Sequence, residues 1–400
     1  QLVIGRPYKE DNMKKSLACV LTLGMALSLA ACGGGGSDKP AETKAAETAA
    51  ATDAVVETEA AGGEEAAEGD LNSKSLEEIT EAAKAEGEVV SVGMPDEWAD
   101  WASLWNEMST TYGLGHNDTD MSSSEELQMF ATEGENATKD IGDVGYGFAS
   151  QAVDEDLVQP YKTSYWDAIP DWAKGDDGKW IVAYTGVTTF LVNTDQVENV
   201  PTSWADIREG DYKVALGPLS GGNAQAAFIA SAYAFGGDMD NLEPAFEFWT
   251  ELAEAGRINT LDITQANFES GEIAVGVVWS FTGIPYSKNI TQYNMTTSVP
   301  SDGALRNGYA SVINKYAPHP NAAALTREVM LSDVGQTFLA LAGAIPSRED
   351  FVIADEYADQ VISKDAVEAA VVITDAAAYS AACENAKTRW EEEVAPLLVQ

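Results

Sequence analysis

The sequence predicts an α/β fold with two lobes. From residue 87 onward, short apolar stretches typical of strands alternate with amphipathic stretches typical of helices, which indicates sheets with crossover helices. Roughly 325 residues after the N-terminal region hold nearly all of the Trp, Tyr and Phe, which is enough chain for two separate cores. No repeat with a period of about 20 to 50 residues is visible, which excludes a solenoid.

The expected elements follow in a regular order, and Ser75 can cap the first helix. In the first half of the folded region we expect a helix at 75–86, a strand at 87–93, helices at 98–112 and 123–133, a strand at 141–145, a helix at 149–155 and a strand at 180–193. In the second half we expect a helix at 203–208, a strand at 213–216, helices at 223–235 and 242–255, an amphipathic turn at 263–270, strands at 273–279 and 308–313, helices within 321–341 and a helical region from 364 onward.

Residues 13–36 resemble a bacterial lipoprotein signal, because two lysines precede an apolar run and small residues then lead to Cys32. We therefore expect a signal peptide over 13–31, lipidation of Cys32, export, and attachment to the outer face of the cell membrane, or a periplasmic location in a cell with an outer membrane. The alternative is a transmembrane helix, but the apolar run is shorter than the roughly 20 residues that span a bilayer. Residues 1–12 resemble upstream translated sequence or a cloning remnant.

The composition excludes several partners and sites. A formal net charge of -42 repels phosphate, so we expect no nucleic-acid partner. Residues 32–72 are mainly Gly, Ala, Glu, Thr and Asp and predict a disordered acidic tether. Because Cys19 lies in the signal and Cys32 at the lipid site, only Cys383 remains in the folded part, which excludes an intramolecular disulfide and a cysteine metal cluster there.

Several short motifs occur in an order typical of one family. They are IGDVG at 141–145 with LVQPY at 157–161, NTDQV at 193–197 with PTSWAD at 201–206, FESGEIAVG at 268–276, APHPNAA at 317–323, LSDVGQ at 331–336 and GAIPSRED at 343–350. Because of these motifs, the chain resembles the type II periplasmic binding proteins of ABC importers, in the branch that binds ferric iron, thiamine, polyamines and phosphorylated compounds. The resemblance covers about residues 87–350.

The resemblance implies a fold and a function. Each lobe would be a mixed sheet flanked by helices, with a cleft between the lobes: lobe 1 over 85–190, lobe 2 over 191–298, and a return to lobe 1 with C-terminal helices over 299–400. Hinges would lie near 185–191 and 297–303. The chain would be a monomeric receptor without catalysis or cofactor, which captures a small solute by lobe closure and delivers it to a permease and an ATPase on separate chains. A secreted hydrolase is the alternative class, but the folded part lacks a Gly-x-Ser-x-Gly elbow.

Two helix starts are candidates for the cleft. Asp120 and the hydroxyls of Ser122, Ser123 and Ser124 lie where a helix begins, and helix N-termini offer free N–H groups. A capping box with Glu125 or Glu126 would explain the same residues. At the second helix start, glycines let the backbone approach a ligand, although they also suit a tight turn; the candidates there are Ser220, Gly221, Gly222 and Asn223.

Aromatic residues complete the candidate site. Trp98, Tyr146, Tyr184 and Thr185 are candidates, because aromatic walls hold amines in the polyamine and thiamine binders; Trp101 and Trp105 suit a core stripe instead. The resemblance places the tyrosine ligands of ferric binders at the end of the strand 273–279, where this chain has Trp279, Ser280, Phe281 and Thr282. We therefore expect no metal, and Trp279, Ser280 and Phe281 are further candidates for contact with the ligand. His116 and His319 form no metal-ligand pattern.

The charge of the ligand is left open by these residues. Asp118, Asp120 and Asp143 favour a cation, whereas the two helix starts favour an anion. We expect a small organic anion or phosphorylated compound, with a cationic amine such as a polyamine or thiamine as the alternative.

Overall fold

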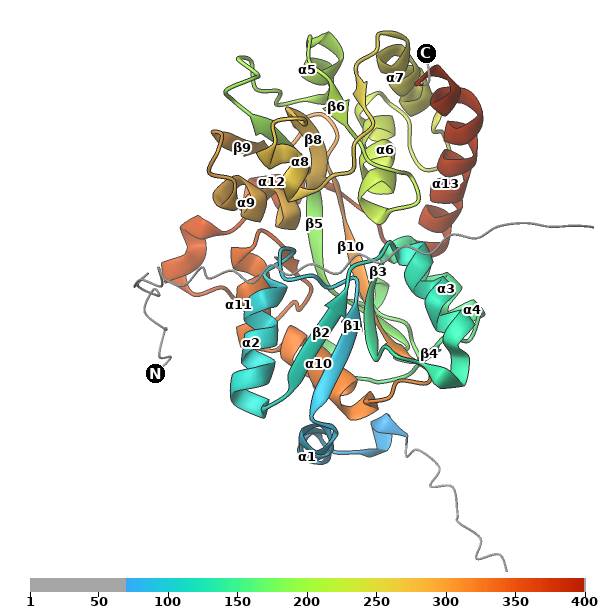
Figure 1. Ribbon diagram of the computed structural model, residues 1–400, viewed down its shortest axis with the longest axis vertical. Coiled ribbons are helices and arrows are strands. Elements are labelled where there is room, and N and C mark those ends of the chain that lie inside the picture. The colour runs from blue at the N-terminus through green and yellow to red at the C-terminus, as the bar shows by residue number, and fades with distance from the viewer. Residues whose placement is uncertain (1–69, 399–400) are drawn as a thin grey trace, which may run out of the picture. The chain divides into compact units, whose positions relative to one another are not determined.

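The computed structural model describes residues 70–398. The predicted signal peptide over 13–31, the lipidation site Cys32 and all of the tether up to residue 69 lie outside the described residues. Within the described part, a long strand, β5 (Trp180–Asn193), belongs to two sheets. Its first half pairs with β10 (Leu305–Asn314) and its second half with β8 (Val275–Trp279), so one strand joins two lobes (Figure 1).

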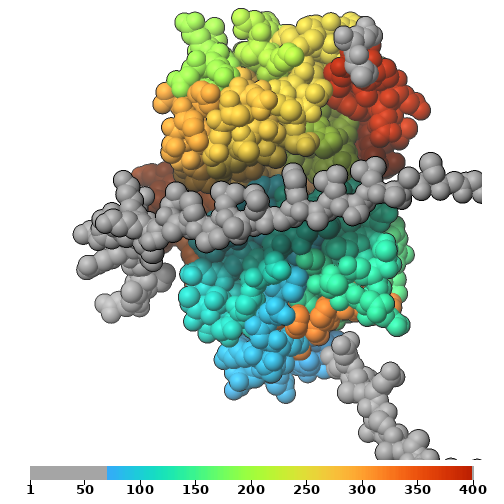
Figure 2. Space-filling model, viewed as in Figure 1, coloured from blue at the N-terminus to red at the C-terminus, as the bar shows by residue number. Residues whose placement is uncertain are grey.

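The first sheet has the order β2-β1-β3-β10-β5. Its first three strands are parallel and β10 is antiparallel to both of its neighbours. Besides β5 and β10 it comprises β1 (Glu88–Val92), β2 (Gly115–Thr119), β3 (Ile141–Gly145), β4 (Val158–Gln159), β11 (Ile345–Pro346) and β12 (Val371–Val372). The helices of this lobe are α1 (Leu76–Glu86), α2 (Trp101–Tyr112), α3 (Ser123–Glu133), α4 (Ala149–Asp154), α10 (Pro320–Leu331) and α11 (Asp333–Leu341). The helices α1 and α10 pack together although they are far apart in the sequence, and Figure 2 shows their blue and orange surfaces side by side.

The second sheet continues from β5 in the order β8-β6-β7, with β9 on the other edge of β5. Its remaining strands are β6 (Val214–Ala215), β7 (Ile258–Asn259) and β9 (Met295–Ser298). Its helices are α5 (Trp204–Glu209), α6 (Gly222–Ala234), α7 (Glu243–Glu254), α8 (Gln265–Glu269) and α9 (Ser280–Asn289). The core of this lobe is aromatic: Trp204 lies edge-on to Phe190, Phe248 and Trp249.

The C-terminal region contains α12 (Lys364–Ala369) and α13 (Ala376–Arg389). The helix α13 contacts both lobes, since Tyr379 packs against Tyr146 while Trp390, just after the helix, packs edge-on to Phe228 and Trp249. The red C-terminal residues accordingly lie along α6 and α7 in Figure 1. Short 3-10 turns lie at Leu71–Ser73, Gly134–Asn136, Tyr146–Phe148, Trp166–Ala168, Asp171–Ala173, Asp355–Gln360 and Ala395–Leu397, and a π turn lies at Trp390–Val394.

Several elements differ from the expectation. The helix α9 and the strands β2, β4, β7, β9, β11 and β12 were not expected, and α2 begins at Trp101 rather than at residue 98. The late start has a backbone cause, because Ala99 and Asp100 have φ angles of 46° and 57°, in the left-handed region that ends regular helix geometry. Trp98 therefore lies in a loop before α2. Trp101 and Trp105 are buried, as the core-stripe alternative predicts.

Candidate functional site

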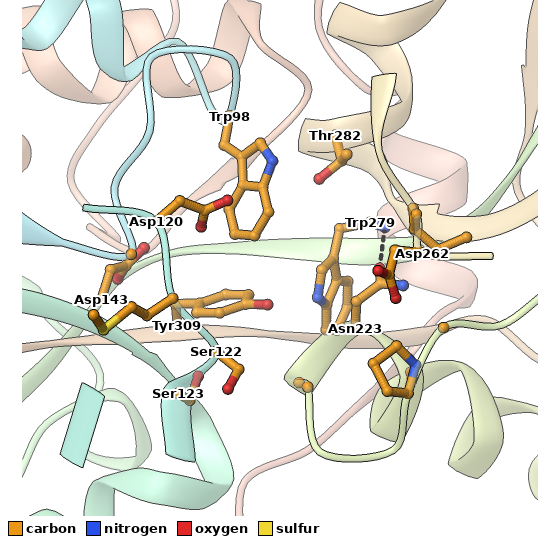
Figure 3. A pocket seen from close by; sticks show the side chains of 18 of the residues that line it. Trp98, Asp120, Ser122, Ser123, Asp143, Asn223, Asp262, Trp279, Thr282 and Tyr309 are labelled. Carbon is orange, nitrogen blue, oxygen red and sulfur yellow. Dashed lines mark hydrogen bonds between the residues drawn. The ribbon is translucent and has the colours of Figure 1, made fainter. Parts of the chain in front are cut away.

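A cavity of about 380 Å³ lies between segments of the two lobes, within the range typical of small-molecule sites. The first lobe contributes the end of β1, the loop after β2, the start of α3 and β3. The second lobe contributes the loop before α6, the end of β8 and the start of α9 (Figure 3). The two lobes also meet directly, because the Ala99 N–H donates to the Phe281 carbonyl at 3.3 Å.

Most of the candidate site residues are brought together here. Those that line the cavity are Trp98, Asp120, Ser122, Ser123, Gly221, Gly222, Asn223, Trp279 and Phe281. They come from segments more than a hundred residues apart, which the loops at the ends of the strands bring to one place.

The other candidate residues, Ser124, Tyr146, Tyr184, Thr185, Ser220 and Ser280, do not line the cavity. The Tyr146 hydroxyl donates to the Trp172 carbonyl at 2.9 Å, and the Ser280 hydroxyl donates to the Gly343 carbonyl at 2.6 Å. The Thr185 hydroxyl accepts a hydrogen bond from Arg306 Nε at 2.9 Å. These polar groups are thus used inside the protein rather than in the cavity.

The start of α3 is a capped helix start at the edge of the cavity. The Ser122 N–H and hydroxyl both donate to Glu125 Oε2, at 3.0 and 2.7 Å. The Ser123 hydroxyl accepts from the Gly145 N–H at 2.9 Å, which ties α3 to the end of β3. Because these serine hydroxyls are engaged and a carboxylate stands in the first turn, this helix start is poorly suited to an anion.

The start of α6 is different, because Gly221 precedes it and no side chain caps it. The Asn223 amide binds β8 on both sides: its Nδ2 donates to the Val277 carbonyl and its Oδ1 accepts from the Trp279 N–H, each at 2.9 Å. The cavity therefore faces backbone rather than a polar side chain at this helix start.

Carboxyl groups dominate the polar lining of the cavity: Asp120, Glu125 and Asp262 are exposed, while Glu126 and Asp143 are buried. Glu126 and Asp143 retain only 1% and 2% of their accessible surface. Among the described residues, neither Glu126 Oε2 nor Asp143 Oδ1 has a hydrogen-bond partner. The cavity lining contains no Arg, Lys or His among the described residues.

The burial of these two carboxyls shifts their pKa values upward. Burial raises the pKa of Asp143 to about 7, although the hydrogen bond from Tyr184 opposes this shift. Burial, with the neighbouring charges of Asp143 and Asp118, raises the pKa of Glu126 well above its ordinary value. Both groups therefore hold a proton far more readily than an exposed carboxylate does.

Aromatic rings form the rest of the wall. Trp279 and Phe281 stack with 5.8 Å between ring centroids, and Tyr309 lies edge-on to Phe281 at 6.1 Å. Trp98 faces this group from the loop before α2 (Figure 3). The indole N–H of Trp279 is buried and has no acceptor among the described residues, so the cavity also offers one free donor.

Sequence reasoning missed several lining residues, above all Glu126 and Tyr309. For Asp143, noted only for its charge, the signal was a carboxylate inside an otherwise apolar buried strand. No such signal distinguishes Glu126, because a glutamate in a first helical turn is ordinary.

The described residues contain no group of three or more His, Cys, Asp or Glu side chains placed to hold a metal ion. His116 stacks on Trp105 with 3.6 Å between ring centroids, and burial lowers its pKa to about 4. His319, which has no place in the cavity either, binds Asp140 Oδ2 through Nδ1 at 3.0 Å. Both imidazoles are therefore occupied within the first lobe.

A family model described as bacterial extracellular solute-binding protein matches residues 136–390. No curated protein sequence matches the chain. In addition, no helix among residues 70–398 is long and apolar enough to cross a membrane.

Solved structures resemble the described fold. The periplasmic binding protein AfuA of Actinobacillus pleuropneumoniae, solved with fructose-6-phosphate, has a TM-score of 0.62 and 17% identity over 76% of this chain and 98% of its own. A substrate-binding protein of an ABC transporter from Bradyrhizobium japonicum has a TM-score of 0.60 and 16% identity over 76% and 99%. Iron-bound HitA of Pseudomonas aeruginosa has a TM-score of 0.58 and 14% identity over 76% and 98%.

At these identities the likeness to solved structures shows the fold alone, and it confirms the predicted two-lobe architecture of type II periplasmic binding proteins. The family model, in contrast, covers more than half of the chain. The chain therefore belongs to the bacterial extracellular solute-binding proteins.

Proposed function

We propose that this chain captures a small solute that carries a protonated amine and delivers it to an ABC permease. The observation that carries the proposal is the charge of the cavity: five carboxyl groups and a set of aromatic rings line it, and no basic side chain does so among the described residues. A cation over an aromatic face, beside carboxylates in a site of low dielectric, is bound by charge and by the ring quadrupole together.

We favour a cationic amine, which was the alternative ligand in the sequence analysis, over a small organic anion. An anion at the start of α3 would lie beside the Glu125 carboxylate, which repels it. The Ser122 hydroxyl donates to Glu125 and is therefore not available to an anion, whereas the Ser123 hydroxyl accepts from the Gly145 N–H and keeps its own hydrogen.

A second candidate ligand carries an acceptor group, such as a phosphate or carboxylate, in addition to the amine. The uncapped start of α6 and the free indole N–H of Trp279 both line the cavity, on the lobe that lacks the buried carboxyls. These donors suit an anionic group at the far end of an amine. A phosphorylated amine would thus satisfy both observations. It is a phosphorylated compound, as expected from the sequence, and its amine suits the carboxyl groups of the cavity wall.

Capture would proceed by lobe closure, with hinges in β5 and in the segment 297–303 that leads to β10. We further propose that Cys32 is lipidated, that the monomeric receptor acts outside the cell, and that the permease and ATPase are separate chains. The signal-like segment at 13–36 supports the first two points. The family supports a receptor rather than an enzyme.

Native mass spectrometry of the chain from Cys32 onward, with Cys32→Ser to prevent lipidation, tests the proposal. We expect an added mass that disappears after unfolding and refolding and that corresponds to an amine. Thermal shift with ethanolamine, putrescine, phosphoethanolamine, inorganic phosphate and fructose 6-phosphate then tests the charge preference. Stabilisation by the amine-free phosphates alone would reject the amine proposal.

A further inference from the structure

We propose that Glu126 and Asp143 form a buried carboxyl pair that selects amines with N–H groups over quaternary ammonium ions and releases a proton to solvent when such an amine binds. This inference rests on the proposed function, because it concerns an amine in the same cavity. It adds a specificity element and a coupling to protons that the acidic cavity alone does not imply.

The Glu126 carboxyl occupies a space shaped for it. Although Glu126 lies in the first turn of α3, its side chain is buried, whereas the adjacent Glu125 binds Ser122 at the surface. Two glycines make the space: a Cβ at Gly142 would lie 2.9 Å from Glu126 Oε2, and a Cβ at Gly93 would collide with Oε1. Any side chain at these glycines would displace the carboxyl, so the inward position of Glu126 is built into β1 and β3.

Asp143 is fixed beside it on β3. Its Oδ2 accepts a 2.5 Å hydrogen bond from the Tyr184 hydroxyl, which leaves Oδ1 as its free acceptor. Glu126 Oε2 and Asp143 Oδ1 are thus two buried acceptors, on side chains that line the cavity, with no hydrogen-bond partner among the described residues. A buried polar group without a partner costs free energy, and such a cost is tolerated where a ligand supplies the partner.

The surroundings of the pair contain negative charge, and none of the described Lys or Arg side chains acts on either carboxyl. Asp118 on β2 and Asp120 in the loop after it lie near the pair, and the hydroxyls of Tyr184 and Tyr309 face it from β5 and β10. Lys139 acts on Asp118 instead and donates to the Thr119 hydroxyl. In the empty cavity the pair therefore keeps a proton near neutral pH, in agreement with the raised pKa values of both groups.

An ammonium changes this balance. Its N–H groups can donate to Glu126 Oε2 and Asp143 Oδ1, and its charge favours the ionised form of both carboxyls, so the proton that the pair holds without a ligand leaves to solvent. A trimethylammonium keeps the charge and the attraction to the aromatic wall but has no N–H to donate. It would leave both buried oxygens unsatisfied, which is the basis of rejection.

Isothermal titration calorimetry of the chain from Cys32 onward, carrying Cys32→Ser, tests this with two matched pairs of probes. Ethanolamine is compared with choline, and phosphoethanolamine with phosphocholine, since the members of each pair differ only by three methyl groups. Titrations near neutral pH in PIPES and in HEPES, whose ionisation enthalpies differ, measure the protons released. The variants are Glu126→Gln and Asp143→Asn, which keep the shape, with Glu133→Gln as the control, because Glu133 lies on the same helix but outside the cavity lining.

We expect the parent protein and Glu133→Gln to bind the N–H amine of at least one pair about tenfold or more tightly than its methylated partner, with a proton released. Glu126→Gln and Asp143→Asn should lose most of this discrimination and most of the proton release. Circular dichroism shows whether each variant is folded, and two variants are used so that the test stands if one of them misfolds. Equal binding within both pairs, or unchanged discrimination in both variants, would overturn this inference while the proposed function stands. Binding of none of the four amines would reject the proposed function and this inference together.

Discussion

The hydroxyl of Tyr184 donates a 2.5 Å hydrogen bond to Asp143 Oδ2 and thereby leaves Oδ1 as the carboxyl oxygen without a partner among the described residues. Tyr184 lies on β5, the strand shared by both sheets, and Asp143 lies on β3 of the first lobe. This hydrogen bond therefore connects the strand that joins the lobes to a buried carboxyl group of the cavity lining. A movement of β5 during lobe closure would reach the carboxyl through this one bond.

Replacing this hydroxyl should weaken ligand binding without disturbing the fold. In Tyr184→Phe, Asp143 loses the hydrogen bond that favours its ionised form, so its pKa rises further and its carboxyl is no longer held in place. We expect the affinity for an amine at neutral pH to fall about fivefold to thirtyfold, which corresponds to about 1–2 kcal/mol. Calorimetric titration measures this loss.

The control for this prediction is Tyr146→Phe. Tyr146 is equally buried, but its hydroxyl donates to the Trp172 carbonyl outside the cavity, so its loss should leave the affinity unchanged. Comparable losses in the two variants would show that a general loosening of the lobe, rather than Asp143, weakens binding.

The pH dependence of stability provides a test without any ligand. The ordinary pKa of Asp143 is 3.8, and burial raises it to about 7 in the folded state. Between these values the folded protein binds a proton that the unfolded chain has already lost, so the contribution of Asp143 to the free energy of unfolding is fully present below about pH 4 and falls as the pH rises to about 7. The decrease has an upper bound on the order of 4 kcal/mol.

Because other groups titrate in the same pH range, the expected effect is a difference in the free energy of unfolding between Asp143→Asn and the parent protein. Asp143→Asn should become more stable relative to the parent as the pH rises from about 4 to about 7, and the difference should level off above that. Urea unfolding at several pH values measures both proteins. Parallel stability curves for the two proteins would contradict a raised pKa at Asp143.

The space made by Gly142 should be essential for Glu126. A Cβ at this position would lie 2.9 Å from Glu126 Oε2 and 3.3 Å from Val92 Cγ1, so Gly142→Ala should destabilise the protein by about 1–3 kcal/mol. Adding Glu126→Ala removes the obstructing carboxyl and should recover part of this loss, which gives a coupling energy in a double-mutant cycle.

Gly115→Ala is a suitable control, since Gly115 is also a strand glycine and a Cβ there would meet its nearest neighbour at an ordinary 3.6 Å. Urea unfolding of the four proteins of the cycle and of this control gives the energies. Strictly additive effects of the Gly142 and Glu126 changes would show that the two residues do not compete for this space.

Most of the fold followed from periodicity in the sequence, because each predicted element buries one face. The helix expected at 242–255 is α7 (Glu243–Glu254), whose buried aromatic residues repeat at helical spacing. The strand β2 escaped prediction because its sequence, GHNDT, has no apolar alternation and is defined by pairing with β1. The helix α9 begins directly after β8 and contains Pro285, so no local signal separates the two elements.

The site was harder to predict than the fold, because it depends on side-chain direction. Tyr184 and Thr185 are neighbours on one strand, so their side chains point to opposite faces and cannot both line one cavity. Glu125 and Glu126 are likewise adjacent on one helix, and one points outward while the other points inward. Which glutamate points inward depends on Gly93, just after β1, and on Gly142 in β3, and the sequence alone does not place these two segments beside α3.

The aromatic wall of the cavity and the carboxyl pair of Glu126 and Asp143 should affect ligand binding in different ways. Trp98 lines the cavity from a loop held in left-handed backbone geometry at Ala99 and Asp100, and this loop contacts the second lobe through the Ala99 hydrogen bond. Because a cation–π contact needs charge and not an N–H group, Trp98→Leu should weaken primary and quaternary amines alike, about fivefold to thirtyfold. Trp98→Phe keeps an aromatic face and should retain most of the affinity.

Trp166→Leu is the matched control: Trp166 is a half-buried tryptophan of the first lobe, packed under Lys162 and Lys174 and outside the cavity lining. Calorimetric titration with ethanolamine and choline distinguishes the outcomes. If Trp98→Leu weakened only the primary amine, the loop would act through the carboxyl pair rather than through the ring, since only the pair distinguishes these ligands. If Trp98→Phe were as weak as Trp98→Leu, the size of the indole and not its π face would determine binding.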